Sequence, residues 1–208
     1  MLLIVLLFLV SYLIGSIPTS VWVGKKFYGI DVREHGSGNA GATNTIRVLG
    51  LKAGLPVFII DIIKGFLAAS LAVFSNYHTV PIAYINLQLI FGFSALLGHI
   101  FPCFAGFRGG KGVATLLGVV IALTPVPALI AFVIFLVVLF IFKYVSVGSM
   151  VAAIFYPLII FFLFPDSAIS IKSASIVMAL ALIITHRKNI KRLIKNEEPK
   201  AKFLYKRK

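Results

Sequence analysis

The sequence has 208 residues, 60% of them hydrophobic, and a mean hydropathy of +1.05. Soluble domains have about 45–50% apolar residues, so this composition indicates a protein whose helices fold in lipid. The formal net charge is +14, but the basic residues lie between and after long apolar runs. A nucleic-acid-binding domain would carry them on one polar face, so we expect no nucleic-acid partner. The single cysteine, Cys103, excludes an internal disulfide.

Long apolar stretches recur along the chain, near residues 2–23, 53–74, 81–98, 112–142, 145–164 and 172–185. No Lys or Arg precedes the first stretch and no small-residue cleavage pattern follows it, so we expect a retained first helix rather than a signal peptide. The fourth stretch would be about 46 Å long as one helix, whereas the hydrocarbon core is roughly 30 Å thick. Pro125 and Pro127 in its centre favour a break. We therefore predict an all-α, polytopic membrane helix bundle with about seven transmembrane helices.

The positive charges predict how these helices are oriented. With seven crossings and an external N-terminus, 18 of the 20 Lys and Arg residues lie in the inside segments 24–52, 99–111, 143–144 and 186–208. Cytoplasmic segments of membrane proteins are enriched in Lys and Arg, and six crossings would place the basic tail opposite the two central loops. We therefore expect an external N-terminus, a cytoplasmic C-terminus and one integral membrane domain over 1–208. Residues 195–208 should form a basic, partly flexible cytoplasmic tail.

The first inside loop contains a segment, Gly36–Arg47, whose residues could hold an anionic ligand. Its glycines, Gly41 among them, permit close approach of the backbone to a ligand. Arg47 offers a planar fork for phosphate or carboxylate. Neutral hydrogen-bonding groups come from Ser37, Asn39, Thr43 and Asn44. A turn-rich connector with a helix cap at Thr43 or Asn44 would have the same composition, so composition alone leaves both interpretations open.

The second inside loop contains Gly98–Gly112, which ends where a helix is predicted to begin. Three glycines surround Lys111 there, and such a loop could expose successive backbone N–H groups to an anion, aided by the helix dipole. The spacing differs from that of a Walker A loop, because Lys111 is followed by Gly112 rather than by Ser or Thr. An interfacial loop with basic anchors is the alternative interpretation.

Two further features place polar groups near or within the membrane. Past the last apolar stretch, His186 and Asn189 are three residues apart and would share a face if the helix continues. A contact of the surrounding basic residues with anionic lipid does not explain these two. Asp61 and Lys64 lie inside the second crossing, where charges are costly and normally pair. A structural ion pair and a direct substrate role are both open for them. The histidines lack metal-binding spacing, so we expect no metal site.

Together these segments resemble the bacterial acyl phosphate:glycerol-3-phosphate acyltransferase family. The family's motifs are similar to SGNxGATNxxR, GHxxPxFxxF(R/K)GGKGxAT and HRxNIxRLxxGxE, and they correspond in order to Ser37–Arg47, Gly98–Thr115 and His186–Glu198. Three motifs with fitting spacing extend the resemblance over essentially the whole chain. One position departs from the pattern, because Asn196 stands where the family has a glycine.

The resemblance implies transfer of a fatty acyl group from acyl phosphate to position 1 of glycerol 3-phosphate. The products would be 1-acylglycerol 3-phosphate and phosphate, at the start of bacterial phospholipid synthesis. It also implies that neither acyl-CoA nor acyl carrier protein is the direct donor, and no cofactor is expected. The HxxxxD motif of acyltransferases that use such donors is absent. We expect a lipid-embedded monomer in the bacterial cytoplasmic (inner) membrane, with its active site facing the cytoplasm.

The residue chemistry suggests roles in such a reaction. Lys111 with the adjacent glycine backbone would hold one phosphate, Arg47 the second, and His186 with Asn189 would complete the pocket. Acyl phosphate is already activated, so the site must mainly position the glycerol hydroxyl and stabilise the developing oxyanion. His186 and a substrate phosphate are both open as the base. We predict catalytic roles for Ser37, Arg47, Lys111, His186 and Asn189. We predict substrate contacts from Asn39, Gly41, Thr43, Asn44, Lys64, His99, Arg108, Gly109, Gly110 and Gly112.

Two other function classes suit parts of the sequence. A transporter or channel for an anionic or phosphorylated solute would explain the many crossings, the Pro and Gly breaks, and the Asp61/Lys64 pair. Against it, the candidate ligand residues lie in inside loops and no inverted repeat is evident. A non-catalytic lipid-binding scaffold would not need three loops rich in Gly and Asn.

Overall fold

The computed structural model describes residues 1–201, and over that range its regular secondary structure consists of helices alone. The helices form two compact units, Met1–Leu123 and the part of the chain from Thr124 onward. The all-α membrane fold class expected from the sequence is confirmed. A single integral membrane domain over 1–208 stays a prediction.

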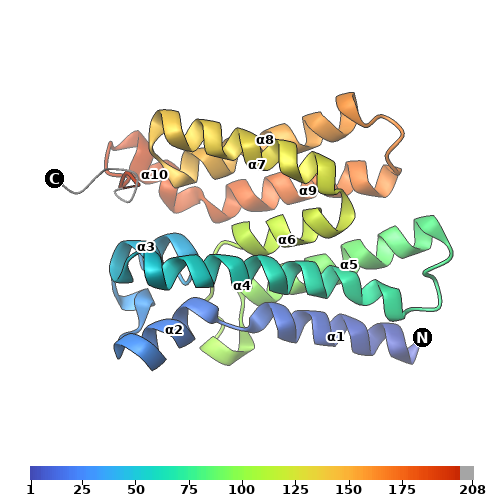
Figure 1. The fold of residues 1–208 in the computed structure, drawn as a ribbon, viewed down its shortest axis with the longest axis horizontal. Coiled ribbons are helices and arrows are strands. Elements are labelled where there is room, and N and C mark those ends of the chain that lie inside the picture. Colours follow the sequence, from blue (N-terminus) through green and yellow to red (C-terminus); the bar gives the residue numbers. More distant parts are fainter. Residues whose placement is uncertain (202–208) are drawn as a thin grey trace. The chain divides into compact units, whose positions relative to one another are not determined.

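The first unit contains α1 (Leu2–Ser16), α2 (Thr19–Tyr28), η1 (Val32–Glu34), α3 (Ala42–Leu49), α4 (Leu51–Ser70), η2 (Leu71–Phe74), α5 (Pro81–Ile100), η3 (Cys103–Ala105) and α6 (Val113–Leu123). Helices α1, α4 and α5 lie side by side, and α6 packs against α4 and α5 (Figure 1). At one end, α1, η2 and α5 share an apolar cluster of Leu7, Ala72, Leu87 and Phe91. The opposite end carries α2, α3 and η3. Two of the predicted inside loops, 24–52 and 99–111, therefore lie at the same end of this unit.

The first apolar stretch is not one helix. Helix α1 ends at Ser16, α2 begins at Thr19, and the axis bends by 42° between them. Pro18 is the cause, because it has no N–H to donate and disfavours the helical conformation of the residue before it. Ile17 accordingly has an extended ψ of 109°. The prediction of a single first helix over 2–23 is therefore wrong, and the end of α1 and the start of α2 both face the interior of the unit.

Close backbone packing brings α6 onto α4. A Cβ atom on Gly65 would clash with the backbone of Thr115, and one on Gly118 would clash with the carbonyl of Ile62. Small residues at such contacts let membrane helices approach until their backbones touch. The contact places Thr115 of α6 at the level of Lys64, the neighbour of Gly65.

The second unit contains α7 (Pro125–Phe142), α8 (Val145–Leu163), α9 (Ile169–Thr185) and α10 (Arg187–Ile194), with α8 packed against both α7 and α9. The predicted break in the fourth apolar stretch is confirmed, since α6 ends at Leu123 and α7 begins at Pro125. The chain bends again, by 56°, between α9 and α10. His186 lies at this bend, so His186 and Asn189 do not share one continuing helix, although both are buried.

Within residues 1–201, four helical segments are long and apolar enough to cross a membrane singly: 51–74, 81–105, 125–142 and 145–163. The bent pairs α1–α2 and α9–α10 could each form one more span, which gives six. A seventh crossing requires α6, which has 11 residues and a length of about 16 Å. Seven crossings with an external N-terminus stay a prediction, because length and composition determine neither the number of spans nor their orientation.

Candidate active site

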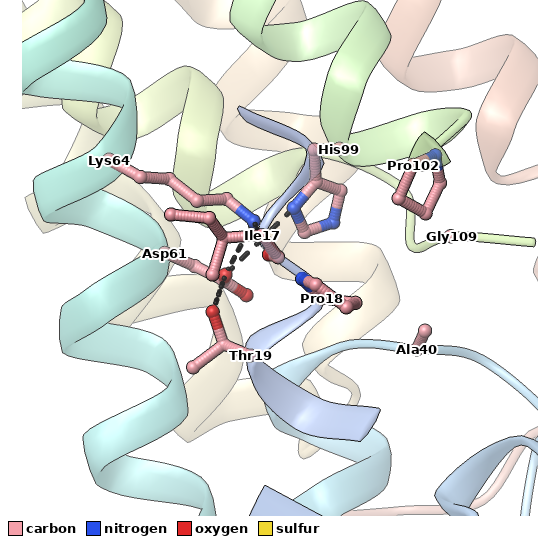
Figure 2. A pocket seen from close by; sticks show the side chains of 9 residues that line it. All are labelled: Ile17, Pro18, Thr19, Ala40, Asp61, Lys64, His99, Pro102 and Gly109. Carbon is pink, nitrogen blue, oxygen red and sulfur yellow. Dashed lines mark hydrogen bonds and ion pairs between the residues drawn. The ribbon is translucent and has the colours of Figure 1, made fainter. Parts of the chain in front are cut away.

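A small pocket lies in the first unit, where the break between α1 and α2 faces α4 and the end of α5 (Figure 2). It is lined by Ile17, Pro18, Thr19, Ala40, Asp61, Lys64, His99, Pro102 and Gly109. Ala40 belongs to the first inside segment, and His99 and Gly109 belong to the second. The two segments that the sequence singles out therefore meet at this pocket.

Asp61 and Lys64 form a buried ion pair of 2.8 Å, with side chains that are 3% and 4% exposed. Asp61 Oδ1 also accepts a hydrogen bond from Thr19 Oγ1 at 3.1 Å, and Lys64 Nζ donates to the carbonyl of Ile17 at 3.0 Å. The carboxylate thus lies at the N-terminus of α2 and the ammonium at the C-terminus of α1, where the helix dipoles favour these charges. The pair has a structural role at the break, and a direct substrate contact of Lys64 stays a prediction.

The imidazole ring of His99 lies between this ion pair and the glycine loop. Its Nδ1 is 3.0 Å from Thr115 Oγ1 and 4.0 Å from Asp61 Oδ1. On the other side, a Cβ atom on Gly110 would clash with His99 Nε2 and with the carbonyl of Ala40. Position 110 needs glycine because the loop backbone passes directly against the ring. The buried ring is therefore positioned by Thr115 of α6 and by the backbone of the glycine loop, with Asp61 of α4 nearby.

Two amides of the glycine loop donate hydrogen bonds to the end of α5. Gly109 N–H donates to the carbonyl of Ile100 at 3.2 Å, and Gly110 N–H donates to the carbonyl of His99 at 3.1 Å. These bonds satisfy carbonyls at the end of α5, which have no partner within the helix. Both amides therefore already have acceptors within the protein, and a contact of Gly109 or Gly110 with substrate stays a prediction. The two hydrogen bonds set the path of the loop that carries Lys111, which is half-buried just before α6.

Asn44 shapes the first inside segment. Its Oδ1 accepts hydrogen bonds from the N–H and the hydroxyl of Ser37, at 2.8 and 3.1 Å. Its Nδ2 donates to the carbonyls of Val32 and His35, at 2.7 and 3.1 Å. An amide side chain has two donors and two lone pairs, so all four positions of Asn44 are used within the protein. These bonds give Asn44 a structural role that positions Ser37, and its predicted contact with substrate stays a prediction.

The other predicted residues of the first unit lie around the same two segments. Arg47 is exposed in the last turn of α3, and its side chain runs beside Gly36. Gly112, with a φ of +81°, precedes α6. Arg108 is exposed. The half-buried residues of the first segment include Ser37, Asn39, Gly41 and Thr43. Substrate contacts by these residues stay predictions.

A buried carboxylate organises the third segment, within the second unit. Glu198 Oε1 accepts hydrogen bonds from Asn189 Nδ2 and from Ser146 Oγ, each at 2.7 Å. Arg192 Nε donates to Glu198 Oε2, also at 2.7 Å. Burial acts to raise the pKa of Glu198, but the three donors outweigh it and hold this pKa below its ordinary value. His186 and Asn189 are thus placed within the second unit, and their joining the pocket of the first unit stays a prediction.

Asn196 makes the turn that the family pattern assigns to glycine. Its φ is +57°, in the left-handed region that asparagine enters more readily than most other residues. The turn lets Glu198 fold back onto α10. Farther along, Ala201 N–H donates to the carbonyl of Lys143 at 2.7 Å, so the predicted tail is packed against the second unit as far as Ala201. The rest of the predicted tail lies outside the described residues.

Comparison with known proteins decides the family. The sequence model of the family described as glycerol-3-phosphate acyltransferase matches residues 5–196. The chain belongs to this family. A glycerol-3-phosphate acyltransferase of Chlorobium phaeobacteroides is 43% identical to it, over 98% of each chain. The similarity confirms the resemblance that the three motifs indicate.

A solved glycerol-3-phosphate acyltransferase also shares the fold. The crystal structure of PlsY (YgiH), an integral membrane glycerol 3-phosphate acyltransferase, in its glycerol 3-phosphate form has a TM-score of 0.84 and 39% identity, covering 95% of this chain and 94% of that one. The structure of its lysphosphatidic acid form has a TM-score of 0.81, with the same identity and coverage. The chain is thus an integral membrane protein of this enzyme family.

Some residues around the pocket of this glycerol-3-phosphate acyltransferase are absent from the sequence-based prediction. Thr19 is one, and Pro18 inside an apolar stretch was the available signal for the break that places Thr19 at the pocket. Thr115 is another, although it ends the second motif. Among residues 1–201, no three His, Cys, Asp or Glu side chains are grouped in a way that could hold a metal ion.

Proposed function

We propose that this chain transfers a fatty acyl group from acyl phosphate to the 1-hydroxyl of glycerol 3-phosphate, giving 1-acylglycerol 3-phosphate and phosphate. The observation that carries the proposal is the contact of the first two inside segments, where Gly110 packs against both His99 and the carbonyl of Ala40. This contact brings the loop of Lys111 and the segment of Arg47 to the same end of the unit. Two phosphorylated substrates require such a concentration of positive charge at one site.

The proposed reaction is a direct transfer. The 1-hydroxyl oxygen of glycerol 3-phosphate attacks the acyl carbon, the bond between that carbon and the phosphate oxygen breaks, and the hydroxyl proton ends on phosphate. Negative charge grows on the carbonyl and leaving oxygens in the transition state, so fixed positive charge beside them lowers the barrier. Holding both substrates in one orientation contributes further by proximity.

Within this proposal, Lys111 binds one phosphate and Arg47 the other. Ser37, Asn39 and Thr43 orient the substrates, and the third motif contributes His186 and Asn189. Either His186 or a substrate phosphate accepts the proton, since imidazole and phosphate groups both have ordinary pKa values near neutrality. The enzyme acts as a monomer in the bacterial inner membrane, with this site facing the cytoplasm. The placement of 24–52 and 99–111 at one end of the first unit supports a single-sided site.

Product analysis with purified protein tests the proposal. The protein is incubated with a long-chain acyl phosphate and labelled glycerol 3-phosphate, without CoA, acyl carrier protein or added metal. We expect labelled 1-acylglycerol 3-phosphate and an equal amount of phosphate, and no effect of a chelator. Product formed only from a thioester donor would contradict acyl phosphate as the acyl donor. Uptake of labelled glycerol 3-phosphate into protein-containing vesicles without acylation would indicate a transporter instead.

A further inference from the structure

Arg33 lies outside the three motifs, yet it connects the two segments that meet at the pocket. It belongs to η1, directly before the first segment. Its Nη1 donates hydrogen bonds to the carbonyls of Ala105 at 2.7 Å and of Arg108 at 3.2 Å. These carbonyls bracket the turn that precedes Gly109. One guanidinium group therefore holds both sides of that turn from a position more than 70 residues earlier in the chain.

Asp31 keeps the guanidinium in this orientation. Its Oδ1 accepts hydrogen bonds from the backbone N–H and from Nε of Arg33, each at 3.0 Å, and its Oδ2 accepts one from Nη2 at 2.7 Å. The side-chain hydrogen bond lowers the pKa of Asp31 and raises the pKa of Arg33. Both groups are therefore charged across the neutral range, and the fork geometry fixes the plane of the guanidinium.

The donors of Arg33 are almost fully used within the protein. A guanidinium has five N–H groups, of which one on Nε and one on Nη2 meet Asp31. Both N–H groups of Nη1 meet backbone carbonyls. At most one donor remains, whereas bidentate binding of a phosphate needs two adjacent donors. The geometry therefore suits Arg33 to hold the protein rather than a substrate.

The other side of η1 is tied to the first inside segment. Asn44 Nδ2 donates to the carbonyl of Val32 at 2.7 Å, and the side chain of Val32 is fully buried. The short helix η1 therefore lies between two loops, bonded by Asn44 to Gly36–Arg47 and by Arg33 to the turn before Gly109. A change in either bond would let the two loops move relative to each other.

We propose that Asp31 and Arg33 form a brace that sets the spacing of the two phosphate-binding loops, with Arg33 as a positioning residue for acyl transfer. The proposal rests on the proposed function of these loops. A displacement of about 1 Å between reacting groups can reduce the rate roughly 100-fold. Loosening the brace therefore lowers kcat/KM for both substrates.

Steady-state kinetics of Arg33→Gln and Asp31→Asn distinguish a brace from a phosphate ligand. For a brace, each substitution lowers kcat/KM for both substrates by roughly 10- to 100-fold. The double substitution is no worse than either single one, because the two residues act as a unit. If Arg33 instead bound a phosphate, Asp31→Asn would remove a repelling carboxylate and lower the KM of that substrate. That decrease would overturn the proposal.

Two further variants complete the kinetic series. Arg33→Lys should recover only part of the activity, because one ammonium cannot meet Asp31 and two carbonyls at once. Glu34→Gln removes the neighbouring exposed carboxylate and should leave the kinetics unchanged. If Glu34→Gln lowered kcat/KM as much as Asp31→Asn does, the effect would come from local charge, and the brace would be contradicted.

Cys103 reports on the same loop independently of activity. It is the single cysteine of the sequence, is partly exposed, and begins η3, two residues before Ala105. Maleimide labelling of the purified protein should be several-fold faster in Arg33→Gln and Asp31→Asn than in the wild type and in Glu34→Gln. Unchanged labelling, with KM raised for one substrate only, would overturn the brace. A wild type inactive with acyl phosphate would contradict the proposed function, while the labelling rates would still decide on the brace.

Discussion

Lys64 donates a hydrogen bond of 3.0 Å to the carbonyl oxygen of Ile17, 47 positions earlier, where the first apolar stretch breaks. The same ammonium pairs with Asp61, which in turn accepts a hydrogen bond from Thr19 at the start of α2. A charge buried in a membrane protein is costly unless it is compensated. Here each charge meets a helix end of opposite sign, so the pair fastens the two halves of the broken helix to α4.

Single substitutions of this pair should destabilise the protein. Asp61→Asn or Lys64→Met leaves one buried charge without its partner, which costs about 3–5 kcal/mol of the free energy of unfolding. Thermal unfolding in detergent measures the loss. The exchanged pair, Asp61→Lys with Lys64→Asp, restores attraction between the two residues but reverses each charge against its helix end. It should remain unstable, and a wild-type midpoint for the exchanged pair would show that the helix ends contribute nothing.

Replacing Lys111 by Ala should slow acyl transfer strongly. Its ammonium is half-buried at the end of the glycine loop, where it would stabilise phosphate charge in the transition state. The expected loss is on the order of 2–4 kcal/mol, or roughly 30- to 1,000-fold in rate, and Lys111→Arg should recover only part of it. The control is Lys191→Ala on α10, which should change little. Near-normal turnover of Lys111→Ala beside a slow Lys191→Ala would place the phosphate site in the basic third segment.

Cysteine accessibility in intact cells tests the predicted orientation. In a variant whose native Cys103 is replaced by Ser, single cysteines are placed at Asn76, between η2 and α5, and at Lys200. The charge distribution predicts that a membrane-impermeant thiol reagent labels position 76 from outside and reaches position 200 only after the membrane is opened. Labelling of position 200 in intact cells would contradict the predicted orientation and place the C-terminus outside.

The stability of the second unit should depend on the charge of Glu198. Its folded-state pKa lies below the ordinary value of 4.5, so the stabilisation is fully present above pH 4.5. It is lost as the pH falls through the folded-state pKa. Glu198→Gln lacks the charged contact with Arg192 and should have a lower unfolding midpoint at neutral pH, with the difference from wild type shrinking below pH 4.5. A difference that stays constant into acid would mean that hydrogen bonding alone, without the charge, accounts for the role of Glu198.

The sequence by itself determined that this protein is an all-α membrane protein and which family it belongs to. Apolar runs and prolines act locally, so a break near Pro125 and Pro127 could be predicted from the sequence. Side-chain types at fixed spacing are also visible in a sequence, which is why three motifs were enough to indicate the family. Pro18 breaks the first apolar stretch in the same local way, so that break could also have been predicted from the sequence.

Only the tertiary structure decided which partner each polar group has. Every backbone carbonyl is alike in a sequence, so the acceptors of Arg33 emerge only when the turn at 105–108 meets η1. The amides of Gly109 and Gly110 donate to carbonyls at the end of α5 because the loop folds back onto it. Asp61 and Thr19 are 42 positions apart and meet because the break at Pro18 turns the start of α2 towards α4. Hydrogen bonds between distant segments depend on how the helices pack, and that packing is set by many weak contacts that no local pattern contains.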